Sequence, residues 1–205
     1  MGILKGGLSV RRYRTAAEPP EGFRDLYIAA LEENCFREPL TAVNKEVRTG
    51  WVQVHNLLDT SFADTNRWLY NQYALFALRI DKKVLPTKLF QAHLQKRVQA
   101  WCQAQSRERC PSSVKQELKE ALEIEMLQKT LPRVAVYEVA WNIAEGFVIF
   151  HNQSEVPNDT FRKLFHKTFG MALIPHDPFD FLADRLDWIE TLSSSGASDL
   201  RPEAM

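Results

Sequence analysis

The spacing of apolar and polar residues predicts both strands and helices in the first part of the chain. Three segments alternate or are continuously apolar, as β-strands are: residues 3–13, 51–57 and 68–80. Between the first two, residues 21–34 predict a helix, because Phe23, Tyr27 and Leu31 recur on one face at intervals of four. This part of the chain therefore combines strands with one amphipathic helix.

Two consecutive helical patterns in the middle of the chain predict a helical hairpin. Pro86 opens the first helix, and its apolar stripe has four members: Phe90, Leu94, Val98 and Trp101. Pro111 interrupts the pattern before a second helix with a matching stripe: Val114, Leu118, Leu122 and Met126. Neither helix can bury its stripe alone. We therefore expect an antiparallel hairpin over about residues 86–131, projecting from a sheet as a lobe, with Ser112 and Ser113 at its tip.

After Pro132 the pattern returns to that of a sheet protein. A strand, a second strand, a helix and a short strand are predicted in this order: residues 134–141, 146–151, 157–169 and 171–175. Gly146 suits the hairpin turn, Gly170 suits the end of the helix, and Asp177 is a good N-cap for a last helix. We expect an α+β fold in which a mixed or antiparallel sheet packs against helices. Residues 1–192 would form one domain, and residues 193–205 a disordered tail.

Composition restricts the class of protein and its compartment. Hydrophobic residues make up 45% of the 205 residues and charged residues 25%, which is typical of a globular protein. No run approaches the roughly 18 apolar residues that a membrane span requires. Cys35, Cys102 and Cys110 form no Cys-x-x-Cys pair and are odd in number, which suits a reducing compartment. We therefore expect a cytoplasmic protein.

Charge is balanced in total but segregated along the chain. Lysine and arginine number 26, as do aspartate and glutamate, so the net charge is zero. Residues 82–109 nevertheless hold seven basic residues against the single Glu108, and residues 177–205 hold seven acidic residues against two basic ones. A basic segment of this kind is compatible with a phosphate-binding face, although a charge run is more often only a solvated face. Its candidate DNA contacts are Lys82, Lys83, Lys88, Lys96 and Arg97.

Signals for catalysis or for a bound metal are weak. Restriction-type nucleases hold Mg²⁺ with an acid followed by Asp/Glu-x-Lys at a strand end, and Asp59 with Asp81 and Lys83 offers such a pattern. The motif is short and common by chance, and strand ends are often charged, so we do not expect these residues to be catalytic. We also expect no cofactor and no metal. Three carboxylates on one face of the last helix form a solvated acidic stripe or a docking face: Asp180, Asp184 and Asp187.

An ordered set of short motifs resembles the bacterial recombination-associated RdgC family. The motifs are Gly50-Trp51-Val52, Asp81-Lys82-Lys83-Val84-Leu85-Pro86, Leu131-Pro132-Arg133, Trp141 and Gly146. The resemblance implies an α+β protein that dimerises into a ring around duplex DNA, binds with little sequence preference and restrains the RecA recombinase. The family also carries an exonuclease label. Its members are usually longer, so the resemblance covers mainly their N-terminal part.

Three hypotheses about function remain open at this point. In the first, a homodimer associated with the nucleoid binds duplex DNA without sequence specificity, through phosphate contacts made by the basic segment. In the second, the chain is a divergent interaction or regulatory module whose helical hairpin and acidic last helix dock other proteins. In the third, it is a Mg²⁺-dependent nuclease that uses Asp81 and Lys83. A salt titration of DNA binding separates the first from the second, and a digestion assay tests the third.

Overall fold

The computed structural model describes residues 7, 9–38, 47–176, 180, 182 and 185–194. Seven strands form one antiparallel sheet: β1 (Arg11–Thr15), β2 (Arg48–Val52), β3 (Leu69–Tyr70), β4 (Tyr73–Lys82), β5 (Arg133–Asn142), β6 (Phe147–Phe150) and β7 (Leu173–Pro175). The helices are α1 (Phe23–Glu33), α2 (Thr87–Ala104), α3 (Ser112–Lys129), α4 (Glu155–Phe169), α5 (Leu186–Ser194) and the 3₁₀ turn η1 (Thr65–Arg67). This arrangement is the predicted α+β fold. No helix within these described ranges is long and apolar enough to cross a membrane.

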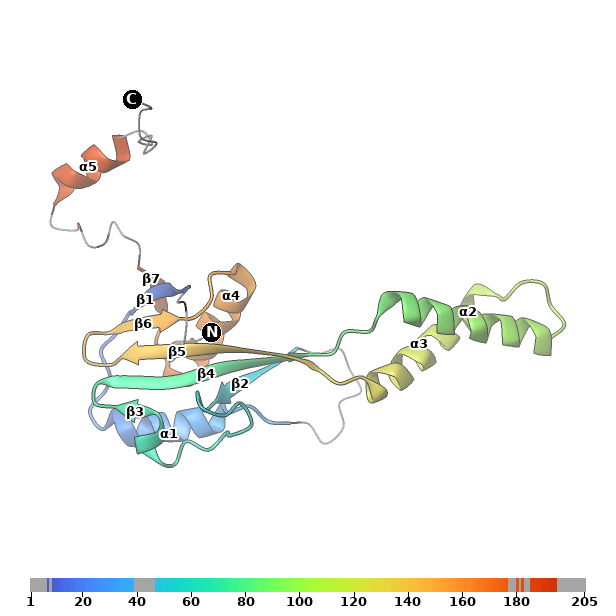
Figure 1. Cartoon of the computed structure of the whole chain (residues 1–205), viewed down its shortest axis with the longest axis horizontal. Helices are drawn as coiled ribbons and strands as arrows, with labels where there is room; N and C mark the ends of the chain where they lie inside the picture. Colours follow the sequence, from blue (N-terminus) through green and yellow to red (C-terminus); the bar gives the residue numbers. More distant parts are fainter. Residues whose placement is uncertain are drawn as a thin grey trace, which may run out of the picture.

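The two long strands β4 and β5 form the centre of the sheet and carry the helical lobe. The order across the sheet is β2-β4-β5-β6-β1-β7, and β3 pairs with the beginning of β4. β4 and β5 pair along their whole length, from Tyr73 opposite Asn142 to Lys82 opposite Arg133. The helices α2 and α3 connect the ends of these neighbouring strands, so the lobe extends from the sheet where β4 ends and β5 begins (Figure 1).

An aromatic core lies between one face of the sheet and the helices α1 and α4. Phe161 of α4 stacks on Phe150 of β6 with their ring centroids 4.3 Å apart. Two polar groups in this core are satisfied across it: Trp51 Nε1 donates to Thr168 Oγ1 at 2.7 Å, and the Tyr13 hydroxyl donates to Asn158 Oδ1 at 2.6 Å. Because a buried polar group without a partner is costly, these bonds fix how α4 sits on the sheet.

The predicted helical hairpin is present, with a thin core. α2 and α3 contact each other, and the turn between them spans residues 105–111, so Ser112 and Ser113 form the first turn of α3 beside the tip. The stripe residues of α2 are half-buried, and no residue of this helix is fully buried. In α3 only Leu122 and Leu127 are fully buried. A two-helix lobe has one interface, which cannot enclose both stripes.

Three of the predicted strands differ from the observed ones. The first described strand is β1, at residues 11–15 and not 3–13, and residues 3–6 and 8 of that prediction lie outside the described residues. The strand predicted at 51–57 is β2, displaced to residues 48–52. The segment 68–80 is a hairpin and not one strand, because Asn71 adopts a φ of 54° in the turn between β3 and β4. Gly146 and Gly170 take the positive φ expected of them.

The predicted end of the chain falls largely outside the described residues. The predicted N-cap Asp177 and Asp184 of the acidic row both lie outside the described residues. Asp187 lies in the first turn of α5, where the positive end of the helix dipole stabilises an acidic side chain. Of the tail predicted at residues 193–205, residues 195–205 are likewise not described.

A close backbone contact requires glycine at position 50. After α1 the chain passes beside β2, where Trp51 N donates to Asn34 O at 3.1 Å and Phe36 N donates to Trp51 O at 2.9 Å. A Cβ atom at Gly50 would lie 2.4 Å from the Cα of Phe36 and 2.5 Å from its nitrogen. These are backbone atoms, held by the two hydrogen bonds, and cannot move away without breaking them.

We predict that Gly50→Ala destabilises the protein by about 3 kcal/mol, because an added methyl group in a tightly packed position forces the backbone apart. The measurement is the free energy of unfolding from urea denaturation. Gly7→Ala is the matched control, because nothing lies within 4 Å of a Cβ at Gly7. A Gly50→Ala variant as stable as the control variant would contradict the observed packing.

Candidate nucleic-acid interface

Three of the five predicted DNA contacts are exposed on or beside the lobe. Lys82 is the last residue of β4, and Lys88 and Lys96 lie on α2. All three side chains are exposed. In sequence, α2 holds three basic residues and no acidic residue. Its exposed surface is therefore positive and suited to contact with phosphates.

The other two predicted contacts are bound within the protein. Lys83 Nζ donates to the carbonyl oxygen of Leu127 in the last turn of α3 at 2.6 Å. The guanidinium of Arg97 forms an ion pair with Glu125, which also accepts from Lys129 Nζ at 2.6 Å. Hydrogen bonds from Lys129 and then Arg97 lower the pKa of Glu125 to about 2, so it stays charged under ordinary assay conditions. Lys83 and Arg97 thus fasten α3 to β4 and α2.

Further basic residues lie next to the exposed lysines, on strands that the charge count along the chain did not single out. In the β4–β5 register Arg133 is opposite Lys82, so two exposed cations stand side by side at the root of the lobe. Arg48, the first residue of β2, is opposite Asp81. Arg48 also belongs to a second group of cations, which lies at the edge of the sheet. Basic groups are therefore present both on the lobe and on the sheet beside it.

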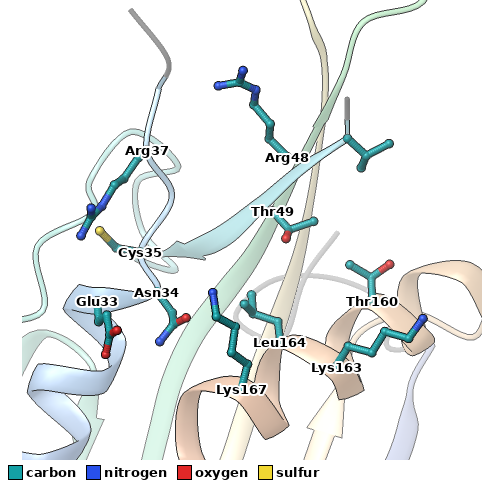
Figure 2. A pocket seen from close by; sticks show the side chains of 11 residues that line it. Glu33, Asn34, Cys35, Arg37, Arg48, Thr49, Thr160, Lys163, Leu164 and Lys167 are labelled. Atoms are coloured by element: carbon teal, nitrogen blue, oxygen red, sulfur yellow. The ribbon is translucent and has the colours of Figure 1, made fainter. Parts of the chain in front are cut away.

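A basic hollow lies between the end of α1, the edge strand β2 and α4 (Figure 2). Its volume is about 560 Å³, and four cations line it: Arg37, Arg48, Lys163 and Lys167. Among the described residues of its lining, Glu33 is the one acidic side chain. Within the described residues, none of the four cations forms an ion pair or a side-chain hydrogen bond. Sequence reasoning missed this group because its members come from three distant segments.

The residues considered for a nuclease site are engaged in internal contacts. Asp81 is buried and accepts two hydrogen bonds from Arg79, from Nε at 2.9 Å and from Nη2 at 2.7 Å. This bonding to Asp81 raises the pKa of Arg79 above its ordinary value. Arg79 also donates to the carbonyl oxygen of Leu57 at 3.2 Å, and its guanidinium lies 4.1 Å from the ring centre of Phe36. The pair therefore joins β4 to the loop that covers this face of the sheet.

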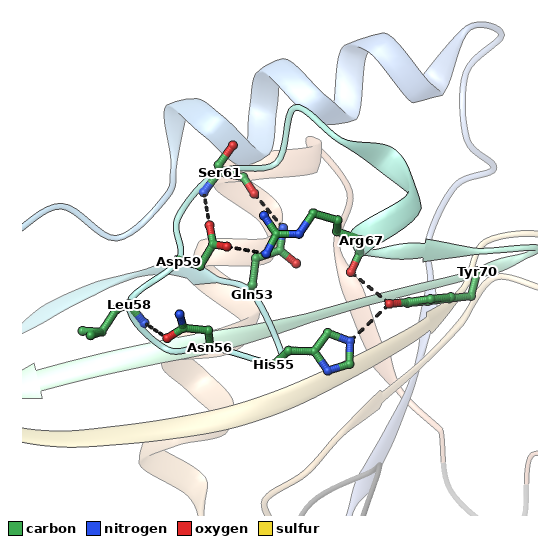
Figure 3. Close-up of polar contacts among 8 residues, drawn as sticks. All are labelled: Gln53, His55, Asn56, Leu58, Asp59, Ser61, Arg67 and Tyr70. Atoms are coloured by element: carbon green, nitrogen blue, oxygen red, sulfur yellow. Dashed lines mark hydrogen bonds and ion pairs between the residues drawn. The ribbon is translucent and has the colours of Figure 1, made fainter.

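Asp59 belongs to a separate polar network in the loop that follows β2 (Figure 3). It accepts from the backbone nitrogen of Ser61 at 3.1 Å and from Arg67 Nη2 at 2.5 Å. The Ser61 hydrogen bond, with a further contribution from Arg67, lowers the pKa of Asp59. Gln53 donates to the carbonyl oxygen of Ser61 at 2.6 Å in the same loop. The network shapes a loop, and its carboxylate is already bonded on both oxygens.

Potential metal ligands are dispersed over the described part of the chain. There, no three side chains of histidine, cysteine, aspartate or glutamate are grouped so that they could hold a metal ion.

Comparison with known proteins gives one family. The family model described as "Putative exonuclease, RdgC" matches residues 10–182 of this chain. The match covers the sheet, the helical lobe and the three elements that line the basic hollow. Among curated proteins, none matches this chain.

We predict that Asp81→Asn destabilises the protein by about 3 kcal/mol, because it removes the buried carboxylate that pairs with the buried Arg79 and leaves only the exposed Glu38, at 3.3 Å, as its charged partner. The free energy of unfolding measures this. Asp159→Asn is the control, because Asp159 pairs with Arg162 on the surface, where such a pair contributes at most about 1 kcal/mol. We also expect no digestion of linear duplex DNA with Mg²⁺. Digestion that Asp81→Asn abolished at a temperature at which the variant is folded would contradict a structural role for this pair.

Proposed function

Because the chain belongs to the RdgC family, which is associated with DNA and recombination, we propose that it binds duplex DNA through the phosphate backbone with little dependence on base sequence. The observation that carries this proposal is the row of exposed lysines on the lobe and at its root: Lys82, Lys88 and Lys96. Contacts between lysine side chains and phosphates supply the sequence-independent part of DNA affinity.

The exposed cations of the proposed interface are lysines, and this supports DNA binding without a preference for base sequence. Base edges are commonly read by paired hydrogen bonds from planar groups such as guanidinium or amide. Lysine presents a compact, flexible charge that suits a phosphate wherever it lies along the groove. The one arginine of α2, Arg97, is held by Glu125 and does not extend freely from the lobe. The exposed positive face of α2 therefore suits phosphates better than bases.

The finer parts of the proposal follow from the family. The protein acts as a homodimer, in the bacterial cytoplasm and at the nucleoid, and restrains a RecA-type recombinase. A protein that covers the duplex backbone competes with a filament that needs the same phosphates. In this proposal residues 1–192 act as one domain, and the lobe at about residues 86–131 supplies the DNA contacts.

We predict that log K for duplex binding falls against log[salt] with a slope of about −3 for each lobe, because each of three phosphate contacts releases about 0.9 counterion. Replacing Lys82, Lys88 and Lys96 by alanine together flattens the slope. Fluorescence anisotropy with a labelled duplex at several salt concentrations measures it. The control is Lys115→Ala with Lys119→Ala, two exposed lysines of α3.

The same titration decides between the hypotheses. Equal affinity for duplexes of unrelated sequence is expected. A triple variant that binds as the wild type does would show that the lobe lysines are not the contacts. No binding at low salt would overturn the proposal in favour of a protein-interaction module.

A second prediction concerns the ion pair inside the lobe. Glu125→Gln releases both Arg97 and Lys129 from their shared carboxylate, so the affinity for duplex DNA rises and the salt slope steepens by about 0.9 for each of the two that contacts a phosphate. The same titration measures both changes. Glu120→Gln removes an equal charge from α3, but Glu120 is bonded to Gln116 and not to a cation. A Glu120→Gln variant with an equal change in slope would mean that net charge, and not the release of the two paired cations, causes the effect.

A further inference from the structure

The basic hollow beside β2 is distinct from the proposed lobe interface in position and in shape. Lys88 and Lys96 lie on an exposed helix and Lys82 lies at the root of the lobe, whereas the four cations of the hollow line a concave space between three elements. In Figure 2, Lys167 extends from α4 toward the space between Asn34 and Thr49. Arg37 and Arg48 lie on the other side of that space, and the Arg48 side chain extends away from Lys167. The hollow therefore offers positive charge from more than one direction.

The excess of positive charge in the hollow contrasts with several arginines elsewhere in the protein, which are paired with carboxylates. Elsewhere the arginines at positions 67, 79 and 97 are paired with carboxylates. Among the residues that the structure describes, four cations and one acidic residue, Glu33, line the hollow, in a chain whose net charge is zero. A concave site with one sign of charge concentrates ions of the opposite sign. The expected ligand is therefore an anion with more than one negative charge.

Size and hydrogen-bonding groups narrow the ligand further. A volume of about 560 Å³ exceeds that of a simple inorganic ion and lies within the range of about 300–1,000 Å³ typical of small-molecule sites. The hydroxyl groups of Thr49 and Thr160 add donors to the lining, and the buried Leu164 supplies an apolar wall. Such a lining suits a phosphate group attached to a neutral organic part.

We propose that this hollow binds the terminal phosphate of a nucleotide, with Lys167, Lys163 and Arg37 as the charged contacts. A phosphate monoester carries a charge of about −1.5 to −2 and three terminal oxygens, so it can engage several cations at once. A phosphodiester inside a duplex has one charge and is flanked by chain on both sides, which keeps it out of a concave site. The choice of a nucleotide as the ligand rests on the proposed function, because the family is associated with DNA.

An alternative role for Lys163 and Lys167 is to stabilise α4. The test must separate this role from phosphate binding. Lys163 and Lys167 lie in the second half of α4, and cations there stabilise the negative end of the helix dipole. Loss of that effect would lower stability and leave phosphate binding unaffected. Both side chains are exposed, so their replacement by alanine removes charge without opening the core.

The test compares each phosphate-bearing probe with its hydroxyl counterpart. The first pair is a duplex with 5′-phosphate ends and the same duplex with 5′-hydroxyl ends, measured by fluorescence anisotropy. The second pair is deoxyadenosine monophosphate and deoxyadenosine, measured by isothermal titration calorimetry. We expect about tenfold tighter binding of the phosphate form, as two or three charge-assisted hydrogen bonds provide. A preference in the second pair alone identifies a free nucleotide as the ligand, and a preference in the first pair alone identifies a DNA end.

The variants separate this site from the lobe. Lys163→Ala with Lys167→Ala abolishes the preference for phosphate, and thermal unfolding verifies that the variant is folded. Lys88→Ala with Lys96→Ala weakens duplex binding but keeps the preference. The absence of any preference in the wild type, or a preference retained by the folded Lys163→Ala/Lys167→Ala variant, overturns the inference. Failure of the lobe proposal alone appears as a Lys88→Ala/Lys96→Ala variant that binds duplex as tightly as the wild type does.

Discussion

The pairing of β4 with β5 along ten residues is the constraint on which the rest of the structure depends. At one end the ladder places Trp141 and Ala74 in the core, and at the other it brings Lys82 beside Arg133. The ends of α2 and α3 are thereby held next to each other, which allows the lobe to close as a hairpin. A shift of one residue would move every side chain of β4 to the opposite face. Arg79 would then enter the aromatic core, so the register cannot slip at low cost.

Much of the fold could be predicted from the sequence, because helices are recorded in local periodicity. The helical pattern at residues 157–169, with Gly170 after it, predicted α4 and its end, and the proline-flanked stripes predicted both lobe helices. The turn at Asn71 was missed, since neither glycine nor proline marks it. β1 was misplaced because Tyr13 is its only fully buried residue. The pairing of β1 with β6 and β7, far along the chain, determines its position.

The candidate site was predictable only in part, because charge along the sequence does not reveal partners in space. Arg97 and Glu125 are 28 positions apart, and Lys83 and Leu127 are 44 positions apart. Nothing local to either segment indicates these contacts. The basic hollow draws on residues from Arg37 to Lys167. Its one local signal was the spacing of Lys163 and Lys167, which places both on the polar side of α4.

The thin core of the lobe has a consequence for how the protein unfolds. α2 buries no residue fully, and the lobe joins the sheet through the ends of β4 and β5. Regions with few buried contacts open at lower free energy than the regions around them, as separate cooperative units. Trp101 lies in the lobe, whereas Trp51, Trp68 and Trp141 are buried in the core. Loss of helical signal on heating should therefore precede the change in fluorescence of the core tryptophans, and one melting temperature would not describe the whole chain.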